Sequence, residues 1–263
     1  MSAAVHSTRT GSGAPLVLVH GLGSSSANWA PVLGALAAHR EVVTLDLPGF
    51  GASAPLAGPV TIATLTDALQ RFLTEEGLDD ADVVGSSMGA RMVLELARRG
   101  HRGDVVALDP GGFWSAGQRV AFAATVRASV ALVRAIQTPL PWLSRSAIAR
   151  SLLLFQFSSH AWRLDPDLVL TELRDFARAT SLDEALDALV SGPEQLGAST
   201  TPGRVAIGWG RFDRVTLPSQ ASVALERFPS ASFHGFARCG HYPHWDQPAE
   251  AARFILRSTG RVD

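Results

Sequence analysis

The chain has 263 residues, of which 46% are hydrophobic and 18% are charged, and its formal net charge at pH 7 is -1. This composition is typical of a globular domain with a full core, and the near-neutral charge argues against nucleic acid or an anionic membrane surface as a partner. One cysteine, Cys239, excludes an internal disulfide. The N-terminus has no secretory pattern, and no apolar run reaches the roughly 18 residues of a membrane span. We therefore expect a cytoplasmic protein without stable membrane insertion.

Strand and helix patterns alternate through the first part of the chain. The N-terminal region leaves room for one short edge strand, at residues 5–9, before the first buried strand. Short, continuously apolar runs then predict strands buried on both faces of a parallel sheet, at residues 16–19, 42–45, 83–84 and 105–108. Helical patterns lie between these runs, at residues 27–39, 61–76 and 91–97. This alternation predicts a doubly wound, mostly parallel α/β sheet.

The alternation stops after the fourth buried strand and resumes some 85 residues later. In between, only helical patterns occur, at residues 120–136, 146–157, 167–179 and 181–190. Strand patterns return at residues 204–209 and 231–236, and a last helix is expected at 248–257. An interval of this length is too long for a simple loop between two strands. We predict a core domain formed by residues 1–112 and 200–263, with residues 113–199 inserted as a helical cap.

A Gly-x-Ser-x-Gly motif at residues 85–89 stands between a predicted strand and a predicted helix. A strand, a sharp turn and a helix with serine at the apex form a nucleophile elbow. The two glycines are needed because a Cβ at either position would clash in so tight a turn. Ser87 is therefore the candidate nucleophile. The alternatives are a purely structural glycine-rich turn, or Ser86, which lacks glycines two residues away on both sides.

An activated serine also needs a base within hydrogen-bond reach and an acid that orients the base. Asp213 comes just after the strand at residues 204–209, and His241 comes just after the strand at residues 231–236. Both are therefore expected at the carboxyl edge of the sheet, where ligands bind in open α/β folds. Asp109 is the alternative acid, because it also ends a strand, and His244 is the alternative base.

Five motifs in this order resemble those of the α/β-hydrolase superfamily, of the capped kind with a serine nucleophile. They cover nearly the whole chain, at residues 20–23, 46–51, 85–89, 208–213 and 240–244. The resemblance implies the triad order Ser87, Asp213, His241. It also implies an oxyanion hole formed by two backbone N–H groups, those of Leu22 and Met88, whose side chains would serve only to line the pocket.

Several other polar residues near these motifs are expected to have structural roles. His20 should order the oxyanion loop, and Asp46 should fix the Pro-Gly loop that follows it. Arg91, one turn beyond Ser87, should reach a loop carbonyl or a carboxylate. Cys239 is expected to be a small buried apolar residue.

No metal or cofactor is expected. His241 and His244 lie three residues apart on a proline-containing loop, without companion ligands for zinc. Gly21 and Gly23 follow a strand, but the third glycine and the later acidic residue of a dinucleotide site are missing.

The predicted function is hydrolysis of an ester or related acyl bond. Aromatic and leucine side chains are frequent in the predicted cap, which favours an apolar pocket and a small hydrophobic ester or acyl substrate. A second predicted function is carbon–carbon bond hydrolysis, because the chain also resembles the meta-cleavage product hydrolases. It departs from them at Ser86, where they usually carry Asn, and at Tyr242, where they usually carry Trp. A third hypothesis is that the protein is a ligand receptor that has kept the fold.

Overall fold

The computed structural model describes residues 5–260, which contain a seven-stranded sheet with strand order β1-β3-β2-β4-β5-β6-β7. The strand β1 pairs antiparallel with β3 at one edge, and every other pair is parallel. The strands are β1 (Ser7–Thr10), β2 (Pro15–Val19), β3 (Glu41–Leu45), β4 (Asp82–Ser86), β5 (Val105–Leu108), β6 (Val205–Gly210) and β7 (Ser232–Phe236). The predicted fold class is confirmed.

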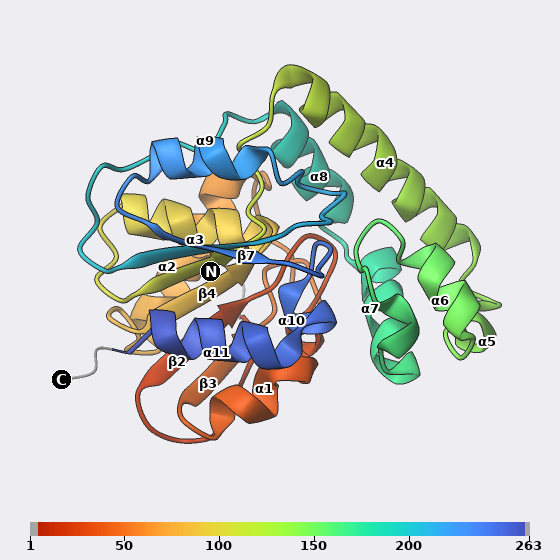
Figure 1. The fold of residues 1–263 in the computed structure, drawn as a ribbon, viewed down its shortest axis with the longest axis horizontal. Coiled ribbons are helices and arrows are strands. Elements are labelled where there is room, and N and C mark those ends of the chain that lie inside the picture. The colour runs from red at the N-terminus through yellow and green to blue at the C-terminus, as the bar shows by residue number, and fades with distance from the viewer. Residues whose placement is uncertain (1–4, 261–263) are drawn as a thin grey trace.

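Helices cover both faces of this sheet, because successive side chains of each buried strand point to opposite faces. On β2, Leu16 and Leu18 face one layer, while Val17 and Val19 face the other. The first layer consists of α1 (Ala30–Ala37) and α11 (Pro248–Ser258). The second consists of α2 (Ile62–Glu75), α3 (Met88–Arg98) and α9 (Gln220–Arg227) (Figure 1). This explains why the strands read as continuous apolar runs.

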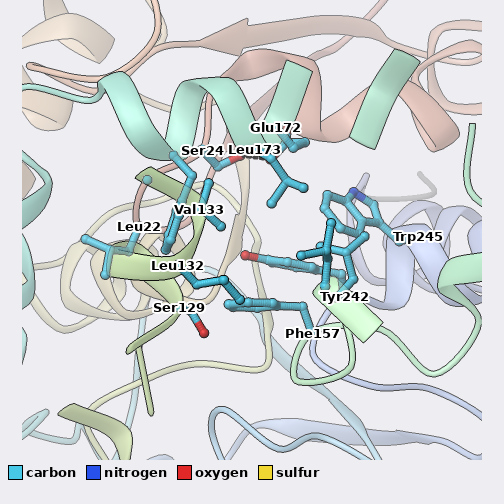
Figure 2. Close-up of a pocket in the computed structure, with 14 residues that line it drawn as sticks. Leu22, Ser24, Ser129, Leu132, Val133, Phe157, Glu172, Leu173, Tyr242 and Trp245 are labelled. Atoms are coloured by element: carbon cyan, nitrogen blue, oxygen red, sulfur yellow. Dashed lines mark hydrogen bonds between the residues drawn. The ribbon is translucent and has the colours of Figure 1, made fainter. Parts of the chain in front are cut away.

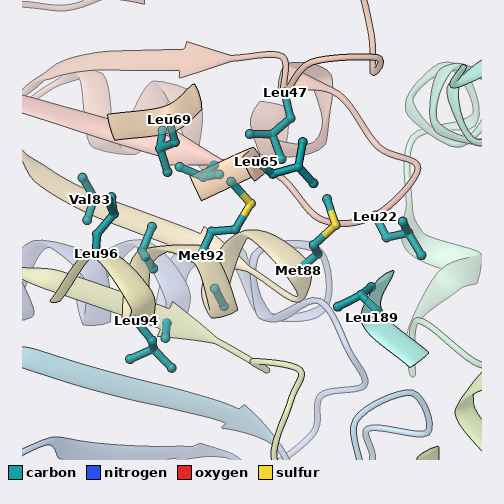
Figure 3. Packing of buried hydrophobic residues seen from close by; sticks show 14 of the residues in the cluster. Leu22, Leu47, Leu65, Leu69, Val83, Met88, Met92, Leu94, Leu96 and Leu189 are labelled. Atoms are coloured by element: carbon teal, nitrogen blue, oxygen red, sulfur yellow. The ribbon is translucent and has the colours of Figure 1, made fainter. Parts of the chain in front are cut away.

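The helix α3, which begins directly after the nucleophile motif, is packed firmly into the core. Figure 3 shows Met88 and Met92 of α3 lying against Leu47 and Leu65. All four side chains are buried. Burying one such side chain contributes about 1.5–3 kcal/mol to stability. The start of α3 is therefore a fixed platform beneath the turn at Ser87.

A helical region connects β5 to β6, as predicted. It comprises α4 (Ala116–Ala135), α5 (Leu140–Leu143), α6 (Ala147–Leu153), a 3₁₀ turn at Ala161–Arg163, α7 (Pro166–Arg178) and α8 (Leu182–Ser191). The helices α5, α6 and α7 stand beyond the sheet at the right of Figure 1, and α4 extends from the core toward them. The helix α8 instead packs Leu182, Leu186 and Leu189 into the main core. The boundaries of the cap at residues 113 and 199 remain a prediction.

Several element boundaries differ from the sequence expectation, and capping explains the clearest cases. The helix expected at residues 27–39 is split into a 3₁₀ turn at Ser26–Trp29 and α1, whose Pro31 fits only a first helical turn. The helix α4 begins four residues earlier than expected, because Ser115 and Gln118 form a capping box there. The short helices α5 and α10 (Pro243–Asp246) were not anticipated. Among residues 5–260, no helix is both long and apolar enough to cross a membrane.

Candidate active site

Ser87 occupies a strained turn between β4 and α3. Its φ of 56° lies in the left-handed region, which a residue with a side chain seldom adopts. A Cβ on Gly85 would lie 2.3 Å from the Gly89 carbonyl oxygen, and one on Gly89 would lie 2.4 Å from the His20 carbonyl oxygen. The Ser87 N–H donates to the Leu108 carbonyl at 2.9 Å. The glycines are therefore required for the reason the sequence indicates, and the turn holds Ser87 at the end of β4.

The loop after β2 lies directly against Ser87, and His20 fixes its geometry. A Cβ on Gly21 would lie 3.1 Å from the Ser87 Cβ. His20 Nε2 accepts the Leu47 N–H at 2.9 Å, so its Nδ1 carries the hydrogen and donates to the Gly21 carbonyl at 2.7 Å. Burial lowers the pKa of His20, which keeps the ring neutral. Because the Gly21 carbonyl and the Leu22 N–H share one planar peptide, this contact also sets the direction of that N–H.

The second predicted donor, the Met88 N–H, is at the first residue of α3. The first N–H groups of a helix have no partner within the helix, and they carry its partial positive charge. The Leu22 side chain lines a pocket, as expected. The Met88 side chain does not, because it is buried in the core (Figure 3).

His241 and Asp213 form a buried pair at the ends of β7 and β6. The His241 Nδ1 lies 2.9 Å from Asp213 Oδ2, and the two side chains are 1% and 0% exposed. Because a carboxylate can only accept, Nδ1 carries the hydrogen and Nε2 keeps its lone pair. Within residues 5–260, Nε2 is buried and makes no hydrogen bond. The imidazole is thus held in the tautomer that a general base needs.

Asp213 is held as an ionised acceptor by donors from its own loop. Its Oδ1 accepts the N–H groups of Val215, at 2.7 Å, and Thr216, at 3.1 Å. Its Oδ2 accepts the Thr216 hydroxyl at 2.6 Å, in addition to His241. Together these four donors occupy the lone pairs of the carboxylate.

Asp109, the alternative acid, lies beside this pair in a different state. Its Oδ1 accepts the Gly210 N–H at 2.8 Å, and its buried Oδ2 has no partner among residues 5–260. Burial, followed by the charge of Asp213, raises the pKa of Asp109 well above its usual value. Asp109, Asp213 and His241 offer ligand atoms within 4.8 Å of one another. A metal ion at this position would have to displace the hydrogen bonds that the Asp213 carboxylate already accepts.

His244, the alternative base, has partners other than Asp213. Its ring packs against that of Trp29, with centroids 4.5 Å apart and planes tilted by 30°, and its Nε2 hydrogen-bonds to Asn28 Oδ1. Burial lowers the pKa of His244 to about 3, so the ring stays neutral.

The remaining polar residues have the structural surroundings that the sequence indicates. The Asp46 carboxylate accepts the N–H groups of Ser26 and Ala52, which ties its own loop together. The Arg91 guanidinium donates to the Pro193 carbonyl, and burial lowers the pKa of Arg91 to about 10. Cys239 is fully buried, which raises the pKa of its thiol.

A largely apolar pocket lies between the oxyanion loop, the Tyr242 loop and the cap helices (Figure 2). It has about 500 Å³ of empty space, counted with its opening to solvent. Its lining comprises Leu22, Gly23, Ser24, Ser129, Leu132, Val133, Leu153, Leu154, Phe157, Glu172, Leu173, Phe176, Tyr242 and Trp245. Thus α4, α6 and α7 all contribute to one cavity next to the residue that follows His241.

Glu172 is the residue in this pocket that sequence reasoning missed. The signal was available, because Glu172 stands within the apolar stripe of α7 formed by Val169, Leu173 and Phe176. An acidic residue on a face otherwise directed toward the interior is unusual, since such a group is seldom fully buried without a partner.

Comparison with known proteins decides the family. Residues 16–254 match the model of the alpha/beta hydrolase family. The chain belongs to the α/β-hydrolase family. Its relatives include the dihydrolipoyllysine-residue acetyltransferase component of an acetoin cleaving system from Cupriavidus necator, which is 30% identical over 97% of this chain. The match spans 66% of that relative's length.

Other similar proteins of the α/β-hydrolase family are hydrolases by name. A 2-hydroxy-6-oxononadienedioate/2-hydroxy-6-oxononatrienedioate hydrolase from Cupriavidus pinatubonensis is 26% identical over 97% of this chain and 90% of its own length. Among solved structures, a thermophilic esterase from Thermogutta terrifontis superposes with a TM-score of 0.74 and 19% identity, covering 96% of this chain and 92% of that one. The chain is therefore similar in sequence to proteins named as hydrolases, and in fold to an esterase.

Proposed function

We propose that this α/β-hydrolase cleaves an ester or related acyl bond of a small, largely hydrophobic substrate, with Ser87, His241 and Asp213 as its catalytic triad. The buried pair of His241 and Asp213 is the observation that carries the proposal, because it sets the imidazole tautomer and leaves Nε2 as an acceptor. The strained turn at Ser87, beside the oxyanion loop, supplies a nucleophile and two N–H donors.

The reaction follows from these positions. The Ser87 hydroxyl attacks the carbonyl carbon as its proton passes to His241 Nε2, and the imidazolium is stabilised by the Asp213 carboxylate. The N–H groups of Leu22 and Met88 stabilise the negative oxygen, and one such donor is worth about 3 kcal/mol of barrier. His241 then returns the proton to the leaving group. Water, activated by the same imidazole, releases the acyl group from Ser87.

Asp109 is not part of this triad in our proposal. It makes no hydrogen bond to His241 within residues 5–260, and burial beside the charge of Asp213 raises its pKa, which disfavours its charged form. A neutral acid stabilises an imidazolium far less than the charged Asp213 does.

The second candidate function is hydrolysis of a carbon–carbon bond, which the names of several relatives favour. The substrates in those names include dicarboxylates. Among the described residues, those that line the pocket include no arginine or histidine, and Glu172 is their only carboxylic acid. A dianion would therefore meet no compensating cation there, and burying an unpaired charge is costly. This contrast makes a neutral ester the better substrate.

A direct competition separates the two functions. Purified protein is assayed with p-nitrophenyl butyrate and with a coloured ring-fission product under the same conditions. We expect turnover of the ester, with kcat/KM at least about a hundredfold higher than for the ring-fission product. The reverse ratio would assign the chain to carbon–carbon bond cleavage with the same triad.

A further inference from the structure

Glu172 places a carboxyl group inside the largely apolar pocket. It lies on α7 at the top of the cavity in Figure 2, above Phe157 and Tyr242. The residue is only 6% exposed. Its Oε2 accepts the Ser24 hydroxyl at 2.8 Å and the Asn28 amide N–H at 3.1 Å, whereas its buried Oε1 has no partner in the described part of the chain. A buried polar atom without a partner normally calls for an explanation.

The hydrogen bonds around Glu172 favour Oε1 as the oxygen that carries the proton of the neutral acid. His244 Nε2 bonds to Asn28 Oδ1, and this directs the amide Nδ2 of Asn28 as a donor to Glu172 Oε2. Ser24 also donates to Oε2. With two donors directed at Oε2, a neutral carboxylic acid places its hydrogen on Oε1, which has no partner within residues 5–260.

The charges around Glu172 favour its neutral form. Asp175, on the same helix, and Asp46, after β3, are both anionic neighbours, and Tyr242 and His244 contribute no positive charge. Burial, assisted by Asp175 and Asp46, raises the pKa of Glu172 to about 8. No arginine is among the residues that line this pocket in the described chain.

We propose that Glu172 is a specificity-determining residue whose Oε1–H donates a hydrogen bond to a neutral oxygen of the substrate. The inference rests on the proposed acyl hydrolase function and adds the substrate class: an apolar acyl or alcohol portion that carries a keto or hydroxyl oxygen away from the scissile bond. A plain alkyl chain would leave the buried hydrogen unpaired, and sites of this kind discriminate strongly against such analogues.

The test compares p-nitrophenyl esters of 4-oxopentanoate, 5-oxohexanoate and 6-oxoheptanoate, each against the straight-chain ester of equal length. The quantity measured is the ratio of kcat/KM for the keto ester to that for the alkyl ester. For at least one length we expect the wild-type ratio at pH 7 to exceed that of Glu172→Leu about tenfold, the effect of one buried hydrogen bond. Glu184→Leu, which removes an exposed glutamate of α8, should leave the ratio unchanged.

A pH profile separates hydrogen-bond donation from a merely structural role. At pH 9.5 the wild-type ratio should fall toward that of Glu172→Leu, because the ionised carboxylate no longer donates. Glu172→Gln should keep the preference at both pH values, since its amide accepts from Ser24 and Asn28 and still donates into the pocket. Because the ratio compares two substrates within one variant, effects of pH or of the substitution that are common to both substrates cancel.

Three results would overturn the proposal: no keto preference in the wild type at any length, a preference that persists in Glu172→Leu, or the same alkaline loss in Glu172→Gln. If the wild type hydrolyses no ester, the proposed function fails on its own, and binding decides the inference. Methyl 5-oxohexanoate and methyl hexanoate are then compared by saturation-transfer NMR on Ser87→Ala. If the keto ester binds selectively and Glu172→Leu abolishes this selectivity in the Ser87→Ala background, the role of Glu172 is supported. Equal binding of the two esters would refute it.

Discussion

The edge of the sheet and the cap pocket are built in different ways. At the sheet edge, Asp213 accepts a full set of hydrogen bonds, and Ser87 is locked between two glycines that tolerate no Cβ. Leucine and aromatic side chains predominate among the described residues that line the cap pocket, and the one carboxyl group among them has an oxygen without a partner there. The sheet edge is preorganised for one reaction, whereas the pocket presents a shape and one carboxyl group that can be changed without altering the chemistry.

This difference predicts that substitutions at the sheet edge will abolish turnover while those in the pocket will redirect it. The strongest test is Ser87→Ala. We expect kcat/KM for a short p-nitrophenyl ester to fall on the order of 10⁶-fold, because no other group can form the acyl-enzyme. The circular dichroism spectrum should be unchanged, since alanine fits where serine does. Substantial residual activity would place the nucleophile elsewhere.

The pair Asp213→Asn and Asp109→Asn tests which acid orients the base. Asparagine at position 213 would donate where the His241 ring also donates, so we expect a loss of about 10⁴ in kcat. Asparagine at position 109 has nearly the shape of aspartic acid and can still accept the Gly210 N–H, so the loss should stay below about tenfold. If Asp109→Asn proves the more damaging substitution, the assignment of the acid is wrong.

Glu172 should also leave a signature in stability. Its folded pKa of about 8 lies above the ordinary value of 4.5, so between these pH values the folded protein retains a proton that the unfolded chain releases. The wild type therefore loses stability as pH rises from about 4.5 to 8. Relative to it, Glu172→Gln should gain on the order of a few kcal/mol across that window.

Urea denaturation at pH 5 and at pH 8 measures this effect. Asp187→Asn provides the control, because its ion pair with Arg127 is exposed and contributes little at either pH. A difference between wild type and Glu172→Gln that does not change with pH would show that Glu172 is ionised in the folded protein.

The smallest predicted effect concerns the backbone at the elbow. Gly89→Ala would push a Cβ to within 2.4 Å of the His20 and Val19 carbonyl oxygens, so we expect a loss of about 1–3 kcal/mol in the free energy of unfolding. Gly34→Ala is the matched control, since Gly34 lies within α1 and a Cβ there meets no atom within 4 Å. It should stabilise the protein by about 0.5–1 kcal/mol. Equal effects of the two substitutions on the unfolding midpoint would contradict the close approach at Gly89.

The contrast also explains how much could be predicted from the sequence. The positions of the buried strands along the chain follow from local patterns, because a strand buried on both faces is continuously apolar, and the turn at Ser87 leaves a fixed motif. The state of Asp109 and the burial of Glu172 depend on neighbours more than a hundred residues away, such as Asp213 and Ser24. The apolar stripe of α7 indicates that Glu172 faces the interior, but no local pattern shows which groups surround it there. The substrate preference of the cap therefore could not be predicted before the fold was known.

Labelling with a fluorophosphonate probe tests the central claim most directly, because the probe reacts only with a serine activated by its neighbours. After tryptic digestion, mass spectrometry should find the adduct on Ser87 in the wild type, none in Ser87→Ala, and strongly slowed labelling in Asp213→Asn. Failure of the wild type to react would indicate a ligand receptor that kept the fold, and an adduct on Ser86 or any other serine would contradict the proposed triad.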